Sequence, residues 1–480
     1  MSGPQVSASR RDAAIVATLA LIARLAVVMW ASVRIPPAAD GTFYHTIATR
    51  IANGQGSTWL WPDGAVTYAA HYPVGYPAIL GAAYAIFGSK PAVAMMVNAL
   101  LGAAGASAVH ALACRLGSRK RALAAGIFAA LHVGLVAYVP ALMTEGLTAS
   151  LWAIGAWAAM RARESNERRI LGWLACSGMI LGVATLVRPQ TIALVPVFGW
   201  LAASGGQGWR VAMQRAIAVT VVALLLCLPW VVRNRVRMGE AGLSFNGGWN
   251  LLIGATPSAH GSWAPLEVPE TCRQVFDEAK KDACFRGEAV KTIAHEPALW
   301  LSIAPAKVAV TFDYCGAAAW YLHDANPRAF PYSWKVALGA AETAAERALL
   351  AAALVAVGWV RGPRRRIRQA GAILALLPLF TQHASLSYLA LTGLIALFGP
   401  ALSSAAFVLP AAMAVIALTA VTHVVFFGAG RYGLPVMPFV SALAAGILPW
   451  ERIPSVLRFT SPVLRCDTPV SQGVDAHAPD

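Results

Sequence analysis

Charged side chains are scarce in this sequence. Asp, Glu, Lys and Arg make up 12% of its 480 residues, whereas a soluble domain averages about 25%. Hydrophobic residues make up 58%, and they gather in runs close to the roughly 20 residues that cross a bilayer. This composition excludes a single soluble core. It predicts an all-α protein that crosses a membrane many times.

Acidic residues are scarcer than basic ones, which gives a net charge of +16. A basic surplus can indicate nucleic-acid binding, but here the basic clusters lie between the apolar runs. Short cytoplasmic loops of membrane proteins are enriched in Lys and Arg. We therefore expect no nucleic-acid partner and place on the cytoplasmic side the clusters at 10–11, 115–121, 161–169 and 361–368.

Metal-type CxxC pairs are absent from the sequence, which has 7 cysteines. Cys272 and Cys284 flank a polar segment and could form a disulfide if that segment faces an oxidising compartment. Four of the other five lie in or beside apolar segments, where cysteine acts as a small buried residue; they are Cys114, Cys176, Cys227 and Cys315.

The apolar runs predict about twelve membrane-spanning helices, with roughly 10 to 13 allowed, because spans need about 20 residues and several runs are short. The first run is too long for a signal peptide and lacks a convincing cleavage site. The predicted spans are 13–33, 92–114, 121–139, 146–160, 170–187, 190–203, 215–232, 341–360, 370–383, 386–400, 404–427 and 433–449.

This reading divides the chain into a cytoplasmic N-terminus at 1–12, a membrane domain at 13–449 and a partly disordered cytoplasmic tail at 450–480. Two long segments, at about 34–90 and 233–340, then lie on the outer side. Long loops with helical patterns of their own are usually functional. We expect a multi-pass protein of a bacterial inner (plasma) membrane.

Two acids are expected at outer ends of spans, where acids are costly and often functional. Asp40 follows the helix-breaking "RIPPAA" and precedes a short helical pattern. It could cap that helix, or it could act as the general base that takes a proton from an attacking hydroxyl. Glu145 could cap the next helix or be a second acid in the same outer cavity.

An aromatic and proline-rich turn, "HYPVGYP", contains His71 and Tyr76. Such a turn is typical of the membrane interface, where Tyr rings lie at the headgroup level. His71 could instead bind a phosphate or, together with Glu145, a divalent metal. No cofactor is certain from the sequence.

Three arginines are also expected at outer ends of spans: Arg188, Arg233 and Arg431. They could be interfacial anchors whose heads reach water. Short outer loops normally avoid Arg, however. An anionic partner such as phosphate would explain them, because the guanidinium fork matches phosphate oxygens.

These segments together resemble the GT-C superfamily of integral membrane glycosyltransferases. The resemblance is to the bacterial branch related to protein O-mannosyltransferases and aminoarabinose transferases. It rests on an ordered set of short motifs between about residues 13 and 449. They are Asp40 with "FYHTIATRIANGQG", "HYPVGYPAILGAAYAIFG", "TEGL", "LVRPQ", "LPWVVRN", "SFNGGWNLLIGATPSAHG" and "RYGLPVMPFV".

The resemblance implies transfer of a sugar from a polyprenyl-phosphate carrier to an acceptor hydroxyl on the periplasmic or extracellular side. The acceptor could be a lipid, a glycan or a protein, and membrane lipids surround the enzyme. Asp40 would be the base and Glu145 the second acid. The donor and its phosphate would be bound by Arg431, Arg188, Arg233, Asn234, Tyr432, His71, Tyr76 and Asn246.

The sequence departs from these families at two places. Many relatives have Asp-Glu where this chain has Asp40-Gly41, and aminoarabinose transferases have Glu-Lys where it has His71-Tyr72. Two other classes stay open: a transporter or flippase of lipid-linked sugars, and a non-catalytic membrane binding protein. An acid at the exit of the first span, followed by two long structured outer segments, favours the enzyme.

Overall fold

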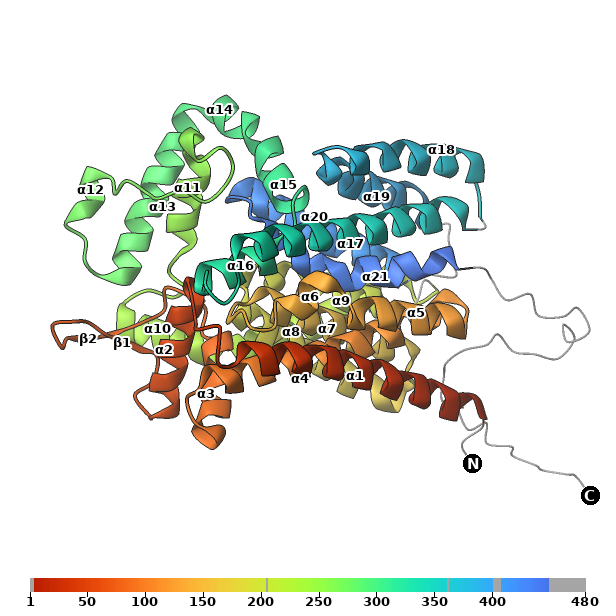
Figure 1. The fold of residues 1–480 in the computed structure, drawn as a ribbon, viewed down its shortest axis with the longest axis horizontal. Coiled ribbons are helices and arrows are strands. Elements are labelled where there is room, and N and C mark those ends of the chain that lie inside the picture. Colours follow the sequence, from red (N-terminus) through yellow and green to blue (C-terminus); the bar gives the residue numbers. More distant parts are fainter. Residues whose placement is uncertain (1–3, 204–205, 361, 400–406, 449–480) are drawn as a thin grey trace, which may run out of the picture.

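The computed structural model describes residues 4–203, 206–360, 362–399 and 407–448. Helices dominate this part of the chain (Figure 1). The sheet found in it has two short antiparallel strands, β1 (Thr58–Leu60) and β2 (Val66–Tyr68). The expected all-α class is therefore confirmed. The tail predicted at 450–480 lies outside the described residues.

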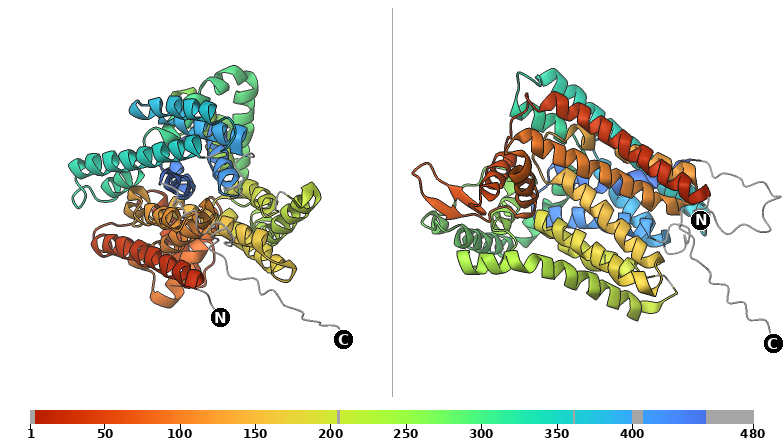
Figure 2. Two further views of the ribbon diagram at one scale, coloured as in Figure 1. Left: turned by 90° about the vertical axis from the view of Figure 1, so that its right-hand side faces the viewer. Right: turned by 90° about the horizontal axis from the view of Figure 1, so that it is seen from below.

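Among the described residues, five helices are long and apolar enough to cross a membrane. They coincide with five of the predicted spans and run lengthwise through the molecule (Figures 1 and 2). These helices are α1 (Pro4–Ala31), α4 (Pro91–Ala113), α8 (Glu167–Val187), α10 (Gly208–Met238) and α20 (Val408–Val425).

Several other predicted spans are broken or shorter in the structure. The run at 121–139 divides at Leu131 and His132. Pro189 begins a 3-10 turn, and Pro378 is the second residue of another that begins at Leu377; proline lacks the N–H that continues an α-helix. The twelve-span count is therefore not established. Two helices are longer than their predicted spans, α7 (Glu145–Glu164) and α17 (Tyr332–Trp359). The remaining helices in the regions of predicted spans are α5 (Arg119–Ala130), α6 (Val133–Ala137), α9 (Leu194–Leu201), α18 (Arg365–Leu376), α19 (Ala384–Phe398) and α21 (Met437–Ala444).

The two long connecting segments gather at one end of the helical bundle, and the start of α1 and the turn from α17 to α18 lie at the other (Figures 1 and 2). The first segment contains α2 (Asp40–Ala52), the β1–β2 hairpin and α3 (Gly75–Phe87). The second contains α11 (Gly247–Ala255), α12 (Glu270–Arg273), α13 (Glu278–His295), α14 (Pro297–Ser302), α15 (Ala304–Phe312) and α16 (Ala317–Ala325).

A disulfide joins Cys272 to Cys284 and so fastens α12 to α13. Cys272 belongs to a small apolar cluster with Leu252 and Phe285, against which Trp249 of α11 packs. The disulfide therefore supports the helix that carries Trp249.

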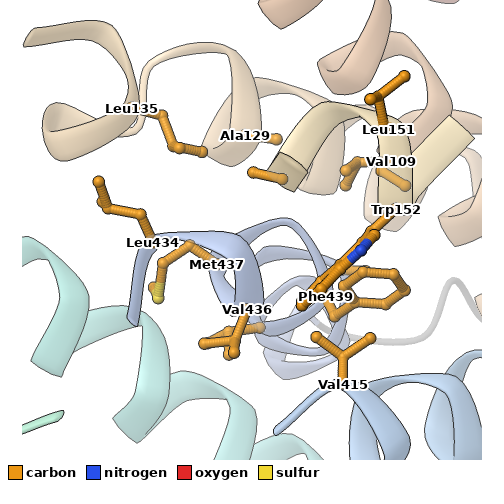
Figure 3. Packing of buried hydrophobic residues seen from close by; sticks show 14 of the residues in the cluster. Val109, Ala129, Leu135, Leu151, Trp152, Val415, Leu434, Val436, Met437 and Phe439 are labelled. Atoms are coloured by element: carbon orange, nitrogen blue, oxygen red, sulfur yellow. The ribbon is translucent and has the colours of Figure 1, made fainter. Parts of the chain in front are cut away.

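The core of the bundle surrounds the segment that leads into α21. Every residue of α21 is buried. Figure 3 shows Leu434, Val436, Met437 and Phe439 facing side chains of other helices, including Trp152 and Leu135. This packing fixes the 3-10 turn at 430–436, from which Arg431 projects.

Candidate active site

Asp40 is the first residue of α2, but its side chain does not cap that helix. Its Oδ1 accepts a hydrogen bond from the hydroxyl of Tyr72 at 2.7 Å, and its Oδ2 accepts one from Nη2 of Arg431 at 3.1 Å. The capping alternative is therefore wrong, because Ala39 is the N-cap residue and no side chain caps the helix.

The backbone before Asp40 is strained. Ala39 has φ 49°, a region that residues with a Cβ atom rarely adopt. Such strain persists only where the surroundings enforce it, and it is concentrated at functional sites. Here the bend lies directly before the residue whose carboxylate enters the site.

Glu145 is the first residue of α7 and is almost completely buried, with 2% of its side chain exposed. Its Oε1 lies 2.9 Å from Nη2 of Arg188 and 3.4 Å from Nε of Arg431. Its Oε2 accepts a hydrogen bond from Tyr138 at 3.2 Å. A buried carboxylate needs such partners to offset its lost hydration.

The ring of Tyr432 lies beside both arginines. The Cζ atoms of Arg188 and Arg431 are 5.0 and 5.2 Å from the ring centroid, within the range of cation–π attraction. The ring itself stacks on His423 at 4.2 Å. Two guanidinium groups are thus fixed close together between an aromatic ring and a buried acid.

These side chains line a polar cavity of about 790 Å³, counting open solvent at its mouth. Both long connecting segments contribute to its wall. The sequence-predicted residues that line it are Asp40, His71, Glu145, Arg188, Asn246, Arg431 and Tyr432.

Three predicted binding residues lie outside this cavity: Tyr76, Asn234 and Arg233. Tyr76 is buried and donates to Asn98 at 3.2 Å. Asn234 is buried and donates to the carbonyl of Gly242. The structure places both apart from the cavity, and a binding role for them stays a prediction.

Arg233 also lies outside the cavity. It donates to the carbonyl of Ser57 at 2.6 Å, and its guanidinium lies over the rings of Tyr68 and Trp230. It ties the base of the β-hairpin to α10 and has no contact with the acids of the site.

Sequence reasoning did not select several residues that line the cavity. Tyr72, Trp249 and Asn250 belong to the motifs "HYP" and "FNGGWN". From these motifs the sequence predicted His71 and Asn246 as binding residues. Burial raises the pKa of Tyr72, so its hydroxyl stays protonated and donates to Asp40. Other lining residues that were missed are Tyr44, Thr144, Gln190 and Trp263.

The expected metal ligands His71 and Glu145 both line the cavity. Both oxygens of Glu145 already have partners among Arg188, Arg431 and Tyr138. No group of three or more His, Cys, Asp or Glu side chains suited to a metal occurs in the described part of the chain. These side chains, as placed, do not form a divalent metal site.

Residues 71–232 match the family model of dolichyl-phosphate-mannose-protein mannosyltransferases. The matched region contains His71, Glu145 and Arg188 of the cavity. It agrees with the resemblance to GT-C glycosyltransferases seen in the sequence. No curated protein matches the chain.

Three solved structures of two proteins are similar to the chain at low identity. An oligosaccharyltransferase from Archaeoglobus fulgidus in the apo form has 14% identity and a TM-score of 0.48, over 91% of this chain and 50% of that one. The same protein complexed with Zn and sulfate has 14% identity and a TM-score of 0.42, over 90% and 48%. ArnT from Cupriavidus metallidurans bound to undecaprenyl phosphate has 15% identity and a TM-score of 0.37, over 89% and 77%. The chain spans about half the length of the oligosaccharyltransferase.

Proposed function

We propose that the protein is a membrane glycosyltransferase that moves a sugar from a polyprenyl-phosphate carrier to an acceptor hydroxyl. The observation that carries this proposal is the joint placement of Asp40, Arg188 and Arg431 in one polar cavity. A carboxylate that can accept a proton lies there beside guanidinium groups that can stabilise a leaving phosphate. The family match to a mannosyltransferase model supports the same reaction class.

The reaction needs two kinds of help, and the cavity offers both. The acceptor oxygen forms a bond to the anomeric carbon of the sugar, while the bond from that carbon to the phosphate oxygen breaks. Asp40 takes the proton of the attacking hydroxyl, as a general base does. The electron pair leaves with the carrier phosphate, whose growing charge Arg431 and Arg188 stabilise.

The proposed site faces the periplasm or the extracellular space. The Cys272–Cys284 disulfide supports this side, because disulfides persist in oxidising compartments. The basic turn from α17 to α18 lies at the opposite end of the bundle (Figure 1), where the positive-inside rule places the cytoplasm. The proposed location is thus a bacterial plasma membrane, with a lipid, glycan or protein as acceptor.

The direct test is to incubate the purified protein with a panel of polyprenyl-phosphate sugars and candidate acceptors and to measure free polyprenyl phosphate. We expect Asp40→Asn to lower turnover by roughly 10²–10⁴-fold, the usual contribution of a general base. Asp63→Asn is the matched control, because Asp63 is an exposed acid at the tip of the β-hairpin.

Two outcomes would overturn the proposal. One is a folded Asp40→Asn protein whose turnover stays within a few-fold of wild type. The other is passage of intact lipid-linked sugar across a vesicle membrane without release of polyprenyl phosphate, which would establish a transporter instead.

A further inference from the structure

Arg431 contacts two acids whose surroundings differ. Its Nε faces Glu145, of which 2% is exposed, and its Nη2 faces Asp40, of which 26% is exposed. Arg431 itself is 27% exposed. The guanidinium therefore contacts a buried acid through Nε and a partly exposed acid, which lines the cavity, through Nη2.

The charges lining the cavity cancel. In the described part of the chain its charged side chains are Asp40, Glu145, Arg188 and Arg431. His71 adds no charge at neutral pH, because burial lowers the pKa of its ring. The cavity thus offers an entering phosphate no net positive charge. Favourable binding of the phosphate requires one acid to separate from its arginine.

Glu145 cannot easily be that acid. It is buried, and it is held by Arg188, Arg431 and the hydroxyl of Tyr138. Removing a carboxylate from such partners leaves buried charges without compensation, which is strongly unfavourable. Asp40 has fewer partners and partial access to water, and a partly exposed ion pair contributes little stability.

We propose that the donor phosphate replaces Asp40 on Arg431, so that donor binding releases the carboxylate that then serves as the base. This inference rests on the proposed function and adds an order to it: donor first, acceptor second. Before the donor binds, Arg431 occupies Oδ2 of Asp40 with a hydrogen bond of 3.1 Å. After the exchange, Oδ1 of Asp40 keeps the hydroxyl of Tyr72 as a partner, and Oδ2 is free to accept the proton of the acceptor hydroxyl beside the sugar.

The geometry allows Arg431 to stay in place during this exchange. Its Nε remains beside Glu145, and its guanidinium remains over the Tyr432 ring. The chain that follows enters the buried segment before α21. Only the Nη2 side of Arg431 changes partner.

The test measures binding and needs no turnover. Full-length protein in lipid nanodiscs is titrated with polyprenyl phosphate that carries no sugar. Because Asp40→Asn removes the competing charge, we expect it to bind this carrier roughly fivefold more tightly than wild type, the effect of a partly exposed ion pair. Polyprenol, which lacks the phosphate, should bind both proteins equally.

Three further variants sharpen the result. Tyr72→Phe removes the uncharged partner of Asp40 and should not tighten carrier binding. Asp63→Asn, remote from the cavity, should leave it unchanged. In an Arg431→Ala background, Asp40→Asn should give no further tightening, because the arginine for which phosphate and carboxylate compete is gone. Asp40→Ser replaces Asp40→Asn if the latter does not fold.

Equal or weaker carrier binding by the folded Asp40→Asn and Asp40→Ser proteins would overturn the exchange. If wild type still releases polyprenyl phosphate from a sugar donor in that case, the glycosyltransferase stands without the exchange. If Asp40→Asn binds the carrier more tightly but no donor is ever turned over, the exchange stands as a binding event and the enzyme proposal fails.

Discussion

Arg188 and Arg431 share one acceptor atom, Oε1 of Glu145, at 2.9 and 3.4 Å. Two guanidinium groups this close would repel each other without the carboxylate between them. The shared acid therefore lets the cavity hold two cations side by side, as a phosphate with several oxygens requires.

Substitutions of Arg431 test how the phosphate is held. Arg431→Ala should lower kcat/KM for the donor strongly, and Arg431→Lys should restore it only in part, because an ammonium lacks the bidentate fork. Arg328→Ala, at an exposed position, is the control. Donor kinetics like wild type in both Arg431 variants would reduce Arg431 to an interfacial anchor.

Tyr321 is expected to position both acids without touching substrate. Its hydroxyl accepts hydrogen bonds from the backbone N–H of Ala38 at 3.1 Å and of Leu142 at 3.4 Å, just before Asp40 and Glu145. Tyr321→Phe removes this shared acceptor and should lower kcat by about tenfold, the scale of ~1.4 kcal/mol, with a smaller change in donor KM.

The control for Tyr321→Phe is Tyr332→Phe, an exposed tyrosine at the start of α17. A purely structural role for Tyr321 would lower the melting temperature and leave kcat per folded molecule unchanged. That result would remove Tyr321 from the catalytic account.

Glu278 should make the outer segments pH-sensitive. Burial raises the pKa of Glu278 from 4.5 to about 7, although its Oε1 accepts a hydrogen bond from the N–H of Ala70. Because the folded pKa is the higher one, the folded state binds the proton more tightly. The associated stability is complete below about pH 4.5 and is lost as pH rises through about 7.

Glu278→Gln should therefore flatten the dependence of melting temperature on pH between about 4.5 and 7. It should also stabilise the protein at pH 8, by at most about 3 kcal/mol. Thermal unfolding at several pH values measures both effects, with the exposed Glu240→Gln as control. An unchanged pH profile in Glu278→Gln would show that the carboxyl titrates normally.

The disulfide should stabilise the second outer segment. Closing the short loop between Cys272 and Cys284 is expected to contribute roughly 2–4 kcal/mol. Reduction should lower the melting temperature and, because Trp249 packs on this unit, raise the KM of a substrate that contacts the cavity wall. Intact-mass analysis with alkylation reports the bond directly, and free thiols at both positions in protein from an oxidising compartment would contradict it.

Membrane orientation can be read from cysteine labelling. Asp63→Cys places an exposed thiol on the β-hairpin, and Arg366→Cys places one near the start of α18, at the other end of the bundle. The native free cysteines in the described part of the chain are buried or half-buried, so these contribute little background. An impermeant maleimide added to cells should label position 63 and not 366. The reverse pattern would turn the cavity toward the cytoplasm.

The sequence supports the helical class well and the site only partly. Apolar runs directly predict α1, α4 and α10, because span length and hydrophobicity are local properties. The clustering of Asp40 with Arg431 is not local, since 391 residues separate them. Charge rules placed both at the same end of their spans but could not pair them.

The misplaced residues show the same limit. Arg233 was expected at a phosphate because of where its span ends, yet the fold gives it a backbone carbonyl and two rings instead. Tyr72 and Tyr138 were missed because an interior hydroxyl partner has no sequence signature. Which polar group meets which is decided by the packing of distant segments.

The 391-residue separation between Asp40 and Arg431 also bears on biosynthesis. A chain emerging from the ribosome exposes its N-terminal segments first. Asp40 and Glu145 therefore lack their shared arginine until the segment carrying Arg431 has been inserted. If the proposed function holds, a partly inserted chain has the acids but cannot bind a carrier phosphate through Arg431. Completion of the cavity is thus a late event of membrane insertion, because the pair of Asp40 and Arg431 forms only when the C-terminal segment is in place.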